Sequence, residues 1–157
     1  MRSHHLRAAA GAGVYSGNIA VVHQSSLFIT AYPWTSGQGF GTKYSDPSTL
    51  PTSTGYSVAW SPDGSDIAVT HSSSPCITVY PWSSSGFGTK YSDPSTLPTS
   101  NGYGVAFSPD GSAIALGYQH SPYIIVYSFS SSGFGTKYSD PATLPAGVGR
   151  GLAFSPA

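Results

Sequence analysis

Short apolar runs, each closed by a turn sequence, follow one another along most of the chain. Near the middle the runs are 56–60, 66–71 and 76–82, and a more polar run at 88–92 follows them. β-Branched and aromatic residues dominate the apolar runs, while Pro, Asp, Gly and Ser separate them. This is typical of strands joined by tight turns. The pattern predicts four short strands linked as hairpins into one antiparallel sheet, and almost no helix.

Strand 76–82 carries apolar side chains on both of its faces. Ile77 and Val79 lie on one face, and Cys76, Tyr80 and Trp82 lie on the other. A sheet patterned in this way needs cover on both sides. Stacking the sheets like blades around an axis provides that cover, and the polar strand at 88–92 suits the outer rim.

The whole unit is repeated. The octapeptide FGTKYSDP begins at Phe40, Phe87 and Phe134, 47 residues apart, and segments 40–65 and 87–112 differ at only three positions. A fixed period of this size indicates a solenoid, propeller or array. We assign 1–18 to an N-terminal tail and 19–157 to the repeats, with units at about 19–53, 54–100 and 101–147 and a terminal strand at 148–157.

The repeat predicts an all-β propeller of four-stranded antiparallel blades, about three per chain. The chain enters a unit at its second strand, 18–23, and leaves after a first strand, 151–156, which is expected to complete a partner's blade. Propellers usually have four to eight blades, so a homodimer with about six blades is the preferred assembly. The expected closure interface is Ile19, Val21, Leu152 and Phe154. The alternative is that the chain is a truncated piece of a longer propeller.

The sequence VAWSPDG at 58–64, VAFSPDG at 105–111 and the partial match LAFSPA at 152–157 resemble the blades of WD-repeat proteins and related bacterial propellers. The resemblance implies blade architecture. The Gly-His pair of that family is absent, and Tyr-Pro-Trp or Tyr-Ser-Phe stands where Trp-Asp is expected. A looser similarity is to phage and metagenomic repeat proteins.

The low content of charged residues excludes some classes of binding partner. Charged residues make up 8% of the chain and the formal net charge is zero, whereas nucleic-acid binders are normally basic. No run is apolar and long enough to cross a membrane, and the N-terminal MRSHHLRAAAGAGV is a weak signal peptide. We therefore expect a soluble protein of unknown compartment that binds neither nucleic acid nor membrane.

Few residues offer chemistry. The aspartates lie in Asp-Gly, Asp-Pro or adjacent turn contexts, which is usually backbone turn chemistry. Lys43, Lys90 and Lys137 each precede an aspartate by three residues, and a solvated rim pair is expected there. His23 and His71 are equivalent, but the third unit has Tyr118, so a repeated metal site is disfavoured. Cys76 aligns with Phe28 and Tyr123, which indicates packing. We predict no catalytic residue, no cofactor and no metal.

The remaining candidates form a surface. The variable loops are expected to share one end of the ring, where they present a candidate binding face of Tyr56, His71, Tyr103, Tyr118 and Arg150. The sequence thus favours a non-catalytic scaffold that closes its ring by homo-oligomerisation and acts as a structural or protein-binding platform. The alternatives are a multivalent, lectin-like glycan binder and, least favoured, a lactonase- or hydrolase-like propeller enzyme.

Overall fold

The computed structural model describes residues 13–156, which form three antiparallel sheets and, within that range, no helix. The first sheet has the order β1 (Ser16–Val22), β2 (Ile29–Thr35), β3 (Gly39–Phe40). The second runs β4 (Gly55–Trp60), β5 (Asp66–His71), β6 (Ile77–Ser83), β7 (Gly86–Phe87). The third runs β8 (Gly102–Phe107), β9 (Ala113–Tyr118), β10 (Ile124–Ser130), β11 (Gly133–Lys137). The predicted all-β fold is confirmed.

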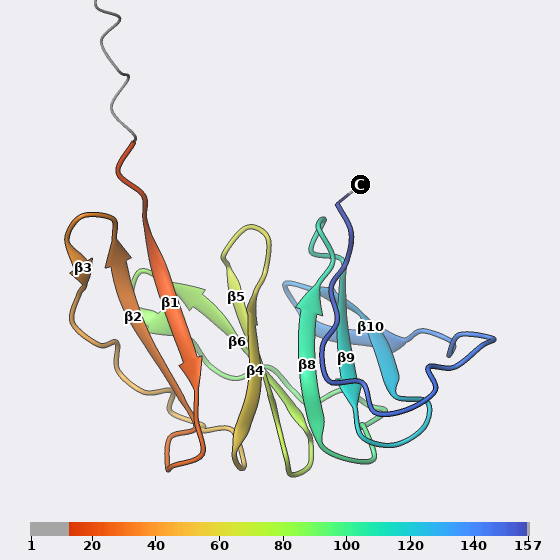
Figure 1. The fold of residues 1–157 in the computed structure, drawn as a ribbon. Coiled ribbons are helices and arrows are strands. Elements are labelled where there is room, and N and C mark those ends of the chain that lie inside the picture. The colour runs from red at the N-terminus through yellow and green to blue at the C-terminus, as the bar shows by residue number, and fades with distance from the viewer. Residues whose placement is uncertain (1–12, 157) are drawn as a thin grey trace, which may run out of the picture.

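The sheets stand side by side as an open fan (Figure 1). β4 packs against β8 and β1 packs against β4, so neighbouring sheets cover one another. β5 shows the consequence of the period-two alternation of strands. Its Ile67 and Val69 enter the core shared with the first sheet, and its Ala68 enters the core shared with the third. The prediction that each sheet is covered on both faces therefore holds for the second sheet.

The SPDG sequence forms the turn between the first two strands of a full sheet. Gly64 adopts a φ of +73°, which a glycine tolerates without strain. Its N–H donates to the carbonyl oxygen of Ser61 at 2.9 Å, and the N–H of Ser65 donates to Oδ1 of Asp63 at 3.1 Å. Gly111 repeats the geometry in the third sheet with the same φ. The prediction of a turn at this position is confirmed.

The outermost strand differs from the prediction of 88–92. β7 pairs with β6 only through Trp82–Phe87 and Ser83–Gly86, whereas β11 extends to Lys137. The reason lies in β6, where Pro81 has no N–H to give to a ladder. Ser128 stands at the equivalent position in the third sheet, and there the outer strand continues.

Two sequence boundaries can be compared with the fold. β1 begins at Ser16, inside the segment assigned to the tail. Residues 151–156, expected as a strand, pair with no other strand of the described chain. The suggested leader at the N-terminus lies largely in 1–12, outside the described residues. Among residues 13–156 there is no helix of the length and apolarity needed to span a membrane.

Candidate functional site

A cleft of about 610 Å³ opens between the second and third sheets, beside their SPDG turns. The turn residues, the start of β5, the tip of the β10–β11 hairpin and one tyrosine from the segment after β7 surround it. The lining residues are Ser61, Pro62, Asp63, Ser65, Asp66, Pro81, Tyr91, Pro109, Asp110, Gly111, Phe129, Ser130 and Ser131. The cleft combines three carboxylates with several hydroxyl groups and contains no basic side chain.

Asp66 is the most enclosed carboxylate of the cleft, with 6% of its surface exposed. It is the first residue of β5, directly after the SPDG turn, and its N–H donates to Oγ of Ser61 at 2.9 Å. Its Oδ2 accepts from Oγ of Ser65 at 2.9 Å, and its Oδ1 accepts from the hydroxyl of Tyr91 at 2.9 Å. The turn therefore fixes the backbone, and two hydroxyl donors fix the carboxylate.

Tyr91 reaches this carboxylate from the outer edge of the second sheet. Its N–H donates to the carbonyl oxygen of Val79 at 3.0 Å, and its ring packs edge-on against Phe129 of the third sheet, 5.7 Å away. Burial raises the pKa of Tyr91 to about 12, and the hydrogen bond to Asp66 and the charge of Asp66 act in the same direction. At neutral pH the side chain is therefore a protonated O–H donor.

Only the second sheet holds a carboxylate in this place. In the first sheet Asn18 replaces Asp66, and its side-chain amide lies 2.9 Å from the hydroxyl of Tyr44. In the third sheet Ala113 stands at the position, and Tyr138, the equivalent tyrosine, is 52% exposed. The tyrosine therefore repeats three times, whereas the tyrosine–carboxylate pair occurs once.

The other two carboxylates of the cleft belong to the turns. Hydrogen bonds from the side chain of Ser61 and from Ser65 lower the pKa of Asp63. Hydrogen bonds from Ser108 and Ser112 lower the pKa of Asp110 to about 2. Both groups are ionised at neutral pH, so the rim of the cleft is negatively charged. The expected turn role of these two aspartates agrees with their contacts, but the same interpretation missed the different environment of Asp66.

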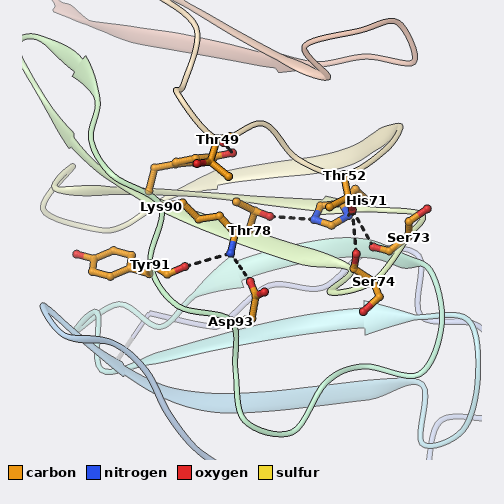
Figure 2. A network of polar contacts seen from close by, with 10 residues as sticks. Thr49, Thr52, His71, Ser73, Ser74, Thr78, Lys90, Tyr91 and Asp93 are labelled. Carbon is orange, nitrogen blue, oxygen red and sulfur yellow. Dashed lines mark hydrogen bonds and ion pairs between the residues drawn. The ribbon is translucent and has the colours of Figure 1, made fainter.

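A second polar network surrounds His71, which is fully buried (Figure 2). Its Nδ1 lies 3.2 Å from Oγ1 of Thr52 and its Nε2 lies 3.0 Å from Oγ1 of Thr78. Thr52 also donates to the carbonyl oxygen of Ser74 at 3.0 Å. Burial lowers the pKa of His71 to about 4, which makes it a weak base. This network anchors the loop between β5 and β6 to the segment before β4.

The lysines that repeat every 47 residues form ion pairs within the connecting segments. Nζ of Lys43 and Nζ of Lys137 each lie 2.5 Å from the aspartate three residues later, and Lys90 pairs with Asp93 in the same way (Figure 2). Lys90 also donates to the carbonyl oxygen of Tyr91 at 3.2 Å. Partly exposed pairs of this kind contribute about 0–1 kcal/mol each, so they shape the segment more than they stabilise it.

The five residues of the expected binding face separate into two groups. The rings of Tyr56 and Tyr103 are in contact, with their centres 4.9 Å apart and their planes inclined by 56°. The Arg150 guanidinium lies 5.4 Å from the centre of the Tyr103 ring. These three form a continuous row across the sheets. His71 and Tyr118 are buried, which corrects their placement on an exposed face. A binding role for the row of Tyr56, Tyr103 and Arg150 stays a prediction.

The structure also places the cysteine and the groups that could bind a metal ion. Cys76 is a buried free thiol whose pKa is raised by burial, as a packing residue requires. Within residues 13–156, no three His, Cys, Asp or Glu side chains gather closely enough to hold a metal ion.

No protein-family model matches the sequence, and no curated protein matches it either. Solved structures do share its fold. One is a protein from Bacteroides fragilis assigned as a 6-phosphogluconolactonase, with a TM-score of 0.58 and 13% identity over 78% of this chain and 34% of that one. A second is the periplasmic gluconolactonase of Pseudomonas aeruginosa, with a TM-score of 0.57 and 14% identity over 83% of this chain and 39% of that one.

A third is a protein from Bacteroides uniformis assigned as a 6-phosphogluconolactonase, with a TM-score of 0.52 and 17% identity over 79% of this chain and 40% of that one. The chain thus spans between about a third and two fifths of the length of these proteins. At such identities the likeness establishes the shared fold.

These structures correct the functional prediction. The sequence favoured a non-catalytic scaffold, with a lectin-like binder as the next choice and a lactonase-like enzyme last. The proteins that share the fold carry the names of lactonases, so the assignment as a non-enzyme is overturned. In the sequence every aspartate was assigned to a turn, whereas in the structure Asp66 also accepts a hydrogen bond from Tyr91.

Proposed function

We propose that the chain forms part of a β-propeller hydrolase that opens sugar lactones, with the cleft at Asp66 and Tyr91 as its active site. The shared fold with lactonases supports the class of reaction. The observation that carries the proposal is the hydrogen-bonded tyrosine–carboxylate pair inside a hydroxyl-lined cleft between two sheets. A carboxylate beside a protonated O–H donor can supply the general base and the hydrogen bond to the oxyanion in ester hydrolysis.

The chemistry assigns one role to each side chain. The carboxylate of Asp66 accepts a proton from a water molecule as the water oxygen bonds to the lactone carbonyl carbon. When the lactone binds, the hydroxyl hydrogen of Tyr91 turns from Asp66 to the carbonyl oxygen and stabilises the negative charge that this oxygen gains. When the tetrahedral intermediate collapses, the bond to the ring oxygen breaks and that oxygen takes the proton from Asp66. Lactone and water thus give one hydroxy acid, and both side chains return to their starting state.

The charge of the cleft selects among lactones. Asp63 and Asp110 are ionised at its rim, and no Lys or Arg lines it. A phosphorylated sugar would bring further negative charge close to these carboxylates, which is unfavourable. The serine hydroxyls at Ser61, Ser65, Ser130 and Ser131 instead suit the hydroxyl groups of a neutral sugar. The proposed substrate is therefore an unphosphorylated sugar lactone.

The test is the rate of δ-gluconolactone hydrolysis above the buffer rate, followed by proton release, with 6-phosphogluconolactone as the charged comparison. The wild-type chain is expected to accelerate the neutral lactone more than the phosphorylated one. Asp66→Asn should lower the enzymatic rate by about 10² or more, because it removes the base. Tyr91→Phe should lower it by about 10² through loss of the donor to the oxyanion.

The repeat supplies the matched control. Tyr44→Phe removes the equivalent hydroxyl beside Asn18, where there is no carboxylate, and should leave the rate within about twofold. A wild-type rate equal to that of buffer would exclude the proposal, as would an Asp66→Asn variant with unchanged activity.

A further inference from the structure

The first sheet presents an apolar edge that the other sheets bury. Ile19 and Val21 of β1 are 38% and 48% exposed. Their equivalents in β5, Ile67 and Val69, are fully buried, and so are the equivalents in β9. The difference arises because the first sheet covers Ile67 and Val69 and the second sheet covers their equivalents in β9, whereas no sheet within residues 13–156 covers the face of β1 that carries Ile19 and Val21. The first sheet also lacks, within these residues, a strand that pairs with β1 as β4 pairs with β5.

Residues 149–156 resemble the strand that the first sheet lacks beside β1. Gly149 is the repeat equivalent of Gly55 and Gly102, the first residues of β4 and β8. Its N–H donates to the carbonyl oxygen of Tyr118 at 3.1 Å, just as the N–H of Gly55 donates to that of His23 at 3.2 Å. The segment then runs beside β8, close to Gly104 (Figure 1). It therefore occupies the place of a first strand of a following sheet.

We propose that residues 149–154 of one copy pair with β1 of a second copy and complete its first sheet. The register follows from the second sheet, where Gly55 lies opposite His71, Val58 opposite Val69 and Trp60 opposite Ile67. The same register places Gly149 opposite His23, Leu152 opposite Val21 and Phe154 opposite Ile19 of the second copy. Leu152 and Phe154, half-buried in one chain, then enter the core of the completed sheet.

A hydrogen bond that repeats along the chain supports the same junction. The hydroxyl of Tyr80 donates to the carbonyl oxygen of Thr49 at 2.7 Å, and that of Tyr127 donates to Thr96 at 2.6 Å. Each bond ties a sheet to the segment that precedes it. The equivalent pair consists of Tyr32 and Thr143, which lie at opposite ends of the described chain. Across the proposed junction they meet.

Aromatic packing between sheets gives a third match. The ring of Tyr44 lies 4.8 Å from Trp82 of the next sheet, and that of Tyr91 lies 5.7 Å from Phe129. The next pair in the series is Tyr138, 52% exposed, and Trp34 of the second copy. The strand pairing, the tyrosine–carbonyl hydrogen bond and the aromatic contact are thus all formed in the same arrangement of two copies. Since each copy carries both surfaces, a two-fold dimer with two identical junctions satisfies all of them. The inference is independent of the proposed catalytic activity.

The test uses native mass measurement of the intact chain and of two charge variants. The wild-type chain should be a dimer, and Val21→Lys and Leu152→Asp should each shift it to monomer by placing a charge in the buried junction. Ser84→Lys, at an exposed hairpin residue, is the control and should remain a dimer. A circular-dichroism spectrum with unchanged strand signal shows that each variant chain remains folded.

Mixing the two variants distinguishes a specific junction from loss of folding. A one-to-one mixture contains one unaltered junction, from Leu152 of the lysine variant to Val21 of the aspartate variant, and one junction that pairs lysine with aspartate. It should recover a dimer with one copy of each. A wild-type monomer would overturn the proposal, and so would a dimer indifferent to both substitutions or a mixture that stays monomeric.

Discussion

His71 shows how a single buried side chain can make the fold sensitive to pH. Both ring nitrogens are engaged by threonine hydroxyls, and burial holds its pKa at about 4, below the ordinary value of 6.5. Between these values an unfolded chain takes up a proton that the folded chain refuses. The free energy of unfolding therefore falls as the pH drops through this window.

The expected loss between pH 6.5 and pH 4 is roughly 3.5 kcal/mol at most, since each pH unit is worth about 1.4 kcal/mol. Urea unfolding at several pH values measures it. His71→Gln removes the titrating group, so its unfolding free energy should change less over the same range, although the variant is less stable at neutral pH. Equal pH dependence in the two proteins would contradict the assignment. Asp110, with a pKa of about 2, contributes only at lower pH.

The contact between Asp66 and Tyr91 could not be predicted from the repeated sequence. Asp63 and Asp66 are neighbours in sequence and both follow a serine-proline turn, so composition assigns them one role. Their contacts differ because Tyr91, distant in sequence, reaches only Asp66. The one available signal was the change from Asn18 to Asp66 to Ala113 among otherwise similar units. The approach of the tyrosine depends on how neighbouring sheets pack, which local sequence does not specify.

At the scale of elements, period-two alternation and turn chemistry were sufficient to place most strands. The range 66–71 was predicted as β5 is observed, and the first and third strands were displaced by about one residue. The outer strand was not predictable from apolarity, because its length depends on whether β6 carries Pro81 or Ser128 at the pairing position. The backbone N–H donors of β6 and β10 therefore determine the length of the outer strand, which hydrophobic patterning does not predict.

The junctions between elements depend on glycines with no space for a side chain. A Cβ on Gly102 would lie 2.7 Å from the carbonyl oxygen of Cys76, whereas a Cβ on Gly147 would have no atom within 4 Å. Gly102→Ala should therefore lower the free energy of unfolding by about 1–3 kcal/mol, as overpacking does. Gly147→Ala should change it by less than about 0.5 kcal/mol. Comparing the two midpoints in urea checks this, and equal midpoints would contradict the close approach.

At the scale of the whole molecule, the stacking of sheets produces the cleft and the exposed edges together. The cleft needs the second and third sheets, both present in one chain, while the edges of the first sheet and of residues 149–156 face outward. The same stacking leaves two surfaces at which a small molecule could bind. One is the cleft at Asp66 and Tyr91, and the other is the row of Tyr56, Tyr103 and Arg150.

The central claim is that the cleft receives a sugar lactone, and amide chemical-shift mapping tests it most directly. The lactam analogue of δ-gluconolactone resists hydrolysis and can be titrated into isotope-labelled protein. The account predicts saturable shifts at Ser65, Asp66, Tyr91 and Gly111, which are lost in Tyr91→Phe and retained in Tyr44→Phe. Shifts confined to Tyr56, Tyr103 and Arg150, or no shifts at millimolar lactam, would contradict it.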